Sequence, residues 1–285
     1  MRLSGIISPV AVVLIALTSA VAISGLLPAT PALAASCGTG GTTWQLGTES
    51  GNVSVLDTAD SWNGGNACLT IGANGVDFTV QSQTINTSNL NPVAFPDTNL
   101  GCEGGFCTST ANQRQALPAV WSNLTPKVTG TWSGFNGTTS STTKYDLLVD
   151  NEFSADCNGS DKKPSMDTAV SIYLDAVKNG VHGSYTALGL ADANSGPTFT
   201  DSDGKVWYTK QTVNSSGIHN TEFSAKVPVS SITSKAMLQF YTWASSHGTG
   251  FMPPNDCLRD LGVGYEPWTQ LKASTLGMSG VLLDP

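Results

Sequence analysis

The chain has 285 residues, a formal net charge of −8 and only 12% charged residues. Its Lys and Arg residues form no cluster that could neutralise a phosphate backbone, so nucleic acid is not an expected partner. Gly, Ser, Thr and Asn are abundant, which suits strands and turns that face neutral polar ligands. Six cysteines, an even number, favour disulfides over metal or redox chemistry in an exported chain.

The N-terminal segment predicts export. Arg2 precedes an apolar run at 10–27, and Ala-Leu-Ala at 32–34 has the small residues of a signal-peptidase site. The run is almost long enough to span a bilayer, so an N-terminal membrane anchor is the alternative. Pro9 and Pro28 interrupt the apolar segment and favour a cleaved signal.

We therefore expect residues 1–35 to be a secretory signal peptide and residues 36–285 to form a single domain. All-β sandwiches reach this length as one unit, and no stretch resembles a linker. Loss of Arg2 with the signal lowers the formal charge from −8 to −9. No later segment is apolar for long enough to cross a membrane. The expected product is a secreted, extracellular monomer without a membrane contact.

Short segments rich in β-branched and aromatic residues recur along the chain, separated by clusters of Gly, Asn, Ser and Asp. This even spacing favours an antiparallel sandwich or barrel. The expected strands, in chain order, are 51–56, 67–71, 76–83, 128–133, 145–149, 169–176, 206–211 and 222–227.

One segment, 234–246, predicts a helix. Ser231 or Ser234 is the expected N-cap, and Gly248 is the expected stop. The predicted fold is thus an all-β sandwich with one short helix. The apolar residues at helical intervals are Ala236, Met237, Phe240, Tyr241 and Ala244.

Four motifs follow one another in a fixed order. The first is Ser-Trp-Asn-Gly at 61–64, bracketed by Cys37 and Cys68. The second is Phe-Pro at 95–96, followed by a Gly-Cys…Cys-Thr-Ser loop that contains Cys102 and Cys107. The third is Tyr-Asp-Leu-Leu at 145–148, which precedes the strand Thr-Ala-Val-Ser-Ile-Tyr-Leu at 168–174. The fourth is Gly-Tyr-Glu-Pro-Trp at 264–268.

Together these motifs resemble glycoside hydrolase family 12, the small jelly-roll endo-β-1,4-glucanases (cellulases) and xyloglucanases. Gly-Lys-Val-Trp at 204–207 also resembles the family's Gly-Gly-x-x-Trp hairpin. The resemblance implies a jelly-roll sandwich of two antiparallel sheets with one short helix, and disulfides Cys37–Cys68 and Cys102–Cys107. Cys157 and Cys257 are outside the family pattern and form an extra bridge or remain free thiols.

The resemblance also implies catalytic residues, with one of them missing. Retaining glycosidases use two carboxyl groups about 5 to 5.5 Å apart. Glu266 matches the acid/base, whereas Ala169 stands at the position of the attacking glutamate. Asp167 points to the same face as Ala169, roughly 7 Å along the strand, and could activate a water in an inverting geometry. Asp146 matches the family aspartate that hydrogen-bonds the nucleophile, and it is expected to face Ala169.

Sugar binding does not need the nucleophile, because aromatic faces stack on pyranose rings. The candidates by position are Trp62, Tyr173, Trp207 and Trp268, while Trp132 is either a further platform or a core residue. The three histidines are scattered, so neither a metal nor a cofactor is expected.

Three functional hypotheses remain open. The first is a β-glucan hydrolase acting on cellulose, mixed-linkage glucan or xyloglucan, with Glu266 as acid/base and Asp146 or Asp167 in place of the lost carboxylate. The second is a non-catalytic protein that binds glucan in the same aromatic-lined cleft. The third is a secreted sandwich without a carbohydrate function.

Overall fold

The computed structural model describes residues 36–39, 46–50, 53–61, 65–72, 75–83, 94–103, 106–107, 117–136, 144–157, 167–178, 181–184, 196–248, 252–267 and 274–284. Side chains are described for 97, 100–101, 117–128, 145–157, 167–178, 181–184, 196–248 and 252–266. Ala32–Pro285 form one compact unit. The predicted signal at 1–35 lies outside the described residues. Within those residues, no helix has the length and apolar character needed to cross a membrane.

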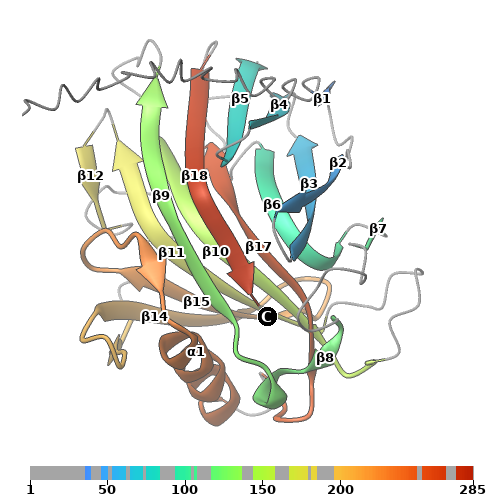
Figure 1. Cartoon of the computed structure of the whole chain (residues 1–285). Coiled ribbons are helices and arrows are strands. Elements are labelled where there is room, and N and C mark those ends of the chain that lie inside the picture. Colours follow the sequence, from blue (N-terminus) through green and yellow to red (C-terminus); the bar gives the residue numbers. More distant parts are fainter. Residues whose placement is uncertain are drawn as a thin grey trace, which may run out of the picture. The chain divides into compact units, whose positions relative to one another are not determined.

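Two β-sheets make up the described part of the chain (Figure 1). The smaller sheet has the strand order β1 (Ser36–Thr39), β4 (Gly65–Gly72), β5 (Gly75–Gln83), β18 (Ser274–Asp284), β9 (Lys127–Asn136) and β16 (Ser231–Ile232). The larger sheet has the order β13 (Thr198–Thr200), β14 (Val206–Val213), β15 (His219–Ala225), β11 (Thr168–Lys178), β10 (Lys144–Ser154), β17 (Cys257–Pro267), β6 (Ala94–Glu103), β3 (Val53–Ser61) and β2 (Leu46–Ser50). Three short strands extend it: β12 (Val181–Gly183) on β11, β7 (Phe106–Cys107) on β6 and β8 (Ala119–Val120) on β17.

The predicted jelly-roll sandwich with one helix is confirmed, and each of the eight expected strands overlaps a strand of the structure. Most observed strands are longer than expected, because polar residues continue the ladders beyond the apolar segments. One pairing departs from the expected antiparallel pattern. β11 and β15 run parallel, with Ser171 opposite Glu222, and β14 pairs antiparallel with the other side of β15.

Side chains alternate between the two faces of the larger sheet, as the period of a β-strand requires. On β11, Val170, Ile172 and Leu174 are buried in the hydrophobic core. On β10 the same face carries Leu147 and Val149. The residues between them therefore point to the other face, which is where the candidate site lies.

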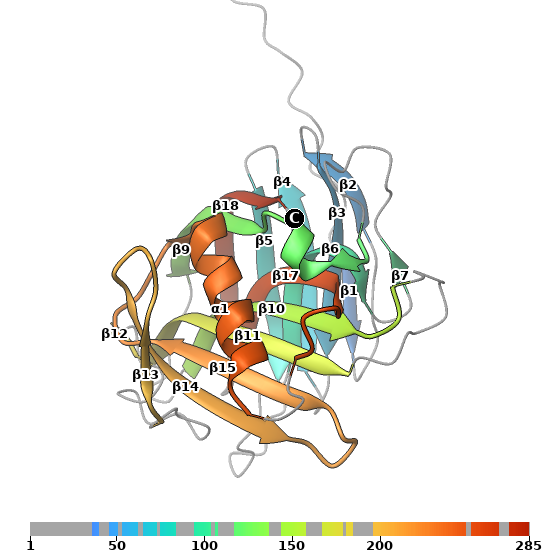
Figure 2. The same cartoon turned by 90° about the horizontal axis from the view of Figure 1, so that it is seen from below.

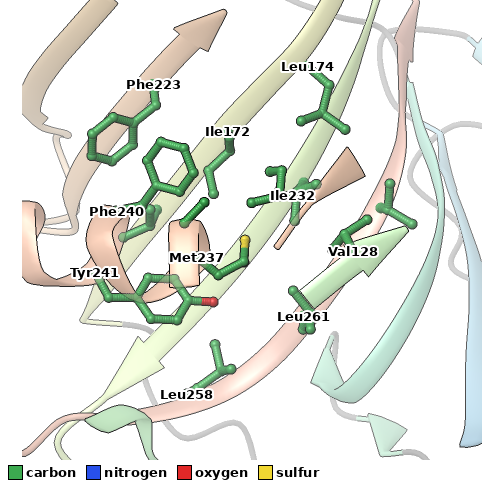
Figure 3. Packing of buried hydrophobic residues seen from close by; sticks show 14 of the residues in the cluster. Val128, Ile172, Leu174, Phe223, Ile232, Met237, Phe240, Tyr241, Leu258 and Leu261 are labelled. Atoms are coloured by element: carbon green, nitrogen blue, oxygen red, sulfur yellow. The ribbon is translucent and has the colours of Figure 1, made fainter. Parts of the chain in front are cut away.

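Helix α1 (Ser234–Ser246) covers the core face of the larger sheet (Figure 2). The five apolar residues expected to face inward are the five buried ones. Met237, Phe240 and Tyr241 point toward the sheet and meet residues such as Ile172 and Phe223 (Figure 3). The Phe240 ring centroid lies 4.7 Å from that of Phe223. Burial of such rings supplies most of the favourable free energy of this layer.

Both ends of the helix have local causes. The N-cap is Thr233, whose hydroxyl accepts a hydrogen bond from the backbone N–H of Ala236 at 3.3 Å. The expected caps were wrong, because Ser231 belongs to β16 and Ser234 is already helical. Gly248 ends the helix as predicted, with a positive φ of 75° that favours glycine.

Candidate active site

Carboxylates gather on the face of the larger sheet that points away from the helix, here called the acidic face. Asp97 on β6, the Cα partner of Gly264, is one of them, and four others are linked by charge interactions centred on Glu266. Each follows or precedes a core residue by one position: Asp146 and Asp150 on β10, Glu222 on β15 and Glu266 on β17. Asp146 is fully buried, and Glu222 is 8% exposed. Because burial of carboxylates is costly, such clusters mark candidate functional sites.

Glu266 and Asp146 form the centre of the acidic face. They are Cα partners in the β10–β17 ladder, and a side-chain hydrogen bond joins them. Two carboxyl groups can share such a bond only when one is protonated. Burial raises the pKa of Glu266 well above its ordinary value, and the charges of Asp146, Asp150 and Glu222 raise it further. Glu266 is therefore the proton donor, and Asp146 is the acceptor.

A second group of polar residues forms a row across four neighbouring strands. Asp150 is the Cα partner of Ser171, Ser171 of Glu222, and Glu222 of Lys210. The Ser171 hydroxyl donates a hydrogen bond to Asp150 Oδ1 at 2.8 Å. Lys210 Nζ lies 3.5 Å from Glu222 Oε2. Burial raises the pKa of Asp150, although its hydrogen bonds to Ser171 and to a backbone N–H oppose that shift.

The expected position of Ala169 opposite Asp146 is wrong. Asp146 is the Cα partner of Ala176, whereas Ala169 is the partner of Glu152 near the other end of β10. The pairing of β10 with β11 continues from Phe153 and Thr168 to Lys144 and Lys178, and Ala169 lies at the turn end of this hairpin, far from Asp146. Ala169 thus lies about 20 Å along the sheet from the level of Glu266, at about 3.4 Å per residue.

Asp167 is also misplaced as a partner for Glu266. It precedes β11, and its Oδ2 accepts hydrogen bonds from the Ser154 hydroxyl at 3.2 Å and the Ala155 N–H at 3.1 Å. Ser154 pairs with Cys257, at the opposite end of β17 from Glu266. Asp167 therefore binds the end of β10, and it is too far from Glu266 to act on the same sugar residue.

The alternation that puts Ser171 and Tyr173 of β11 on the acidic face is broken by a β-bulge. Tyr173 pairs with Leu148, but Asp175 pairs with Leu147, so Asp175 moves to the core face. There Asp175 and His182, with ring nitrogen and carboxylate 2.5 Å apart, line a pocket of about 210 Å³ that also contains Tyr145 and Tyr265. Burial raises the pKa of Asp175, opposed by the hydrogen bond and charge of His182. This pocket lies on the other face of the sheet from Glu266.

The four aromatic candidates have different outcomes. Tyr173 is half-buried on the acidic face, next to Ser171 in the alternating pattern. Trp207 is fully buried in the core against Phe240, at a ring-centroid distance of 4.9 Å, so its prediction as a sugar platform is wrong. Trp62 and Trp268, and the side chain of Trp132, lie outside the described residues.

Trp207→Phe tests this placement of the tryptophan. The indole N–H donates a hydrogen bond to Asp201 Oδ2 at 2.9 Å, and Asp201 is 5% exposed. Loss of that donor is expected to lower the free energy of unfolding by about 1–3 kcal/mol, as measured by urea unfolding. Retention on insoluble glucan should not change. Weaker retention of the variant on glucan, with an unchanged free energy of unfolding, would mean that Trp207 contacts the sugar.

The cysteines fall into two groups. Cys157 and Cys257 form a disulfide, which settles the choice between an extra bridge and free thiols. Cys37 and Cys68 are Cα partners across β1 and β4. Cys102 and Cys107 are Cα partners across β6 and β7. The side chains of these four cysteines lie outside the described residues, and their bridges stay predictions.

Two members of the acidic face were not predicted from the sequence. Asp150 follows the expected strand 145–149 directly, and it has the same parity as Asp146. Glu222 is the first residue of an expected strand. The alternation of side chains along a strand could assign each of them to one face of its own strand. Only the pairing of the strands shows that these residues share one face of the sheet.

The stacked sheets, the single helix of the described residues and the acidic face define a β-jelly-roll protein with a carboxylate-rich surface. This jelly roll is the glycoside hydrolase family 12 fold, which confirms the resemblance at the level of fold. A family 12 xyloglucanase from Bacillus licheniformis superposes with a TM-score of 0.66 at 10% identity, over 88% of this chain and 99% of that chain. The endoglucanase Cel12A from Rhodothermus marinus gives 0.64 at 18% identity, over 88% and 98%.

Endoglucanase 3 of Trichoderma harzianum, also from family 12, gives a TM-score of 0.62 at 16% identity, covering 90% of this chain and 99% of that chain. The sequence matches no protein-family model, and a search of the curated proteins finds no significant relative. The likeness is thus one of backbone architecture, with little residue identity behind it.

Proposed function

We propose that this protein is a secreted, endo-acting β-glucan hydrolase with Glu266 as its general acid. The carrying observation is the hydrogen-bonded carboxyl pair of Glu266 and Asp146 on the acidic face, where burial and neighbouring charges raise the pKa of Glu266. The fold is that of proteins named endoglucanases and xyloglucanases. This supports, without establishing, a glucan as the substrate.

The proposed chemistry begins with proton transfer from Glu266. Cleavage of a glycosidic bond requires a proton on the leaving oxygen, because an alkoxide is a poor leaving group. A carboxylic acid donates that proton at neutral pH only when its pKa is raised, as burial and the neighbouring charges raise that of Glu266. Asp146 touches Glu266 and acts through it, as a positioning residue that holds the acid in place and keeps it protonated.

The charge of the site favours a neutral polysaccharide. Four carboxylates on one face and a net charge of −8 would repel uronic acids and other anionic chains. Tyr173 provides an aromatic surface beside the row of polar residues. Cellulose, mixed-linkage glucan and xyloglucan are the substrates to compare.

The test is release of reducing sugar from soluble mixed-linkage glucan and xyloglucan, with carboxymethyl cellulose as the anionic chain that the acidic face should disfavour. Wild type should release sugar, Glu266→Gln should not, and Asp203→Asn is a matched carboxylate control away from the acidic face. The alternative of a non-catalytic glucan binder is favoured by Ala176, the β11 residue opposite Asp146, which supplies no second carboxylate beside Glu266. It predicts retention on insoluble glucan with no release by any variant, and that result would refute the hydrolase.

A further inference from the structure

The pocket beside Asp175 and His182 lies on the core face of the larger sheet, away from the acidic face. It has a volume of about 210 Å³. Its floor consists of Tyr145, Leu147 and Tyr265, each at most 4% exposed. The two tyrosine rings meet edge to face, with centroids 5.9 Å apart. Sites for drug-sized ligands usually have about 300–1,000 Å³, so this pocket suits a smaller molecule.

The rim of the pocket is held by backbone hydrogen bonds and opens to solvent. His182 belongs to β12, which pairs with β11 (Figure 1). The segment 228–230 forms another part of the rim, and the Val229 N–H donates a hydrogen bond to the Leu174 carbonyl at 2.9 Å. The His182 side chain is 50% exposed, and both ends of the segment are exposed. The pocket is therefore preformed and accessible to a ligand.

Asp175 brings a buried carboxylate to this pocket. Its side chain is 12% exposed, and its Oδ2 lies 2.5 Å from His182 Nδ1. The backbone N–H groups of Ala176 and Gly183 also act on the carboxylate. Oδ1 is nevertheless buried, and no group among the described residues donates a hydrogen bond to it. Because a buried acceptor without a donor costs free energy, a ligand that supplies the donor would be stabilised here.

The charges around the pocket favour a cationic ligand. A neutral imidazole with its proton on Nδ1 donates to Oδ2 and leaves the carboxylate of Asp175 negative. Burial raises the pKa of Asp175, because a poorly solvated carboxylate lacks the water that would stabilise its charge, and a cation at Oδ1 replaces that water. No lysine or arginine of the described residues lines the pocket. Asp146, on the opposite face and directly after Tyr145, adds negative potential.

We propose that this pocket binds a small organic ammonium ion, namely a primary amine with a compact apolar body. The ammonium group donates a hydrogen bond to Asp175 Oδ1, while His182 keeps Oδ2. The apolar body lies against Tyr145, Leu147 and Tyr265, and aromatic walls tolerate a nearby cation. The site is independent of the proposed glucan hydrolysis, so either proposal can fail without the other.

The experiment is an NMR titration of the ¹⁵N-labelled full chain at neutral pH with three probes. Benzylamine combines the ammonium group with an apolar ring, benzyl alcohol has the same shape without the charge, and methylamine has the charge without the ring. We expect saturable binding of benzylamine with a dissociation constant of about 0.1–1 mM, given the affinity per atom that small ligands reach. The other two probes should bind at least about tenfold more weakly. Amide shifts should centre on Leu147, Asp175 and Val229.

Asp175→Asn keeps the shape of the side chain and removes its charge. It should weaken binding of benzylamine about 10–100-fold, as for the loss of a hydrogen bond to a charged group, and leave binding of benzyl alcohol unchanged. Asp203→Asn, a matched change outside the pocket, should bind benzylamine as wild type does.

Four results would overturn the proposal. They are no saturable binding of benzylamine, equal affinity of wild type for benzylamine and benzyl alcohol, unchanged binding of benzylamine by Asp175→Asn, and shifts centred on Asp150 and Glu222. The last result would place the amine on the acidic face. The shift map and the comparison of probes use wild type alone, so they decide the question even where Asp175→Asn does not fold.

Discussion

Replacement of Glu266 by glutamine is expected to slow hydrolysis of β-glucan by about 10²–10⁴-fold, the usual effect of removing a general acid. Glutamine has nearly the same shape and can still donate a hydrogen bond to Asp146, so the site should keep its geometry. The loss should appear mainly in kcat, because the proton is transferred only in the transition state. Initial rates on mixed-linkage glucan measure it, with Asp203→Asn as control.

The pH dependence of activity tests the same role of Glu266. Glu266 works as the protonated acid, and its raised pKa keeps the proton to a pH well above the ordinary value of 4.5. Activity should therefore persist through the weakly acidic range and fall as pH rises through the raised pKa. Asp146→Asn removes the nearest negative charge and should move this alkaline fall to lower pH. An alkaline limb that stays in place would exclude Glu266 as the titrating acid.

The same shift has a consequence for stability. Glu266 has a higher pKa in the folded than in the unfolded chain, so its contribution is fully present below pH 4.5 and is lost as pH rises through the folded pKa. Glutamine does not ionise. Glu266→Gln should accordingly unfold at a higher temperature than wild type near neutral pH, with the difference vanishing near pH 4. An inactive variant that is more stable cannot owe its inactivity to misfolding.

The fold could be predicted from the local sequence, because the helix and each strand bury one set of regularly spaced apolar residues. The helix was predicted to the residue, since Ala236, Met237, Phe240, Tyr241 and Ala244 leave no other periodicity. Its cap was not, because serine and threonine compete at neighbouring positions and the path of β16 decides between them. Trp207 was misjudged for a similar reason. A tryptophan in a strand can point to either face of the sheet, and Phe240 of the helix that covers Trp207 comes 33 residues later in the chain (240 minus 207).

The site was harder to predict because it depends on register. Glu266 and Asp146 emerged from motifs, and the ladder of β10 and β17 brings them together. The pairing of β10 with β11 depends on the length of their connection and on the bulge at Leu147 and Leu148, neither of which the motifs define. Glu222 was beyond reach, because its parallel pairing with β11 joins segments separated by a whole hairpin.

Removal of the disulfide by the double change Cys157→Ser and Cys257→Ser is expected to lower the free energy of unfolding by about 4–5 kcal/mol. The bridge has a sequence separation of 100, and closing a loop of this length restricts the unfolded chain by about that amount. The melting temperature should fall by roughly 10–20 °C, at about 2–4 °C per kcal/mol for a domain of this size. Differential scanning calorimetry of the two proteins measures the difference.

This loss should affect stability and leave catalysis intact, because the bridge and the acid lie at opposite ends of β17. Cys257 begins that strand and Glu266 lies next to its last residue. The ladder between β10 and β17 continues from Ser154 to Tyr145 and holds the folded strands in register without the sulfurs. Below its melting temperature, the double variant should therefore keep the kcat of wild type. A large loss of kcat in the fully folded double variant would instead mean that the bridge also fixes the position of Glu266 at the other end of β17.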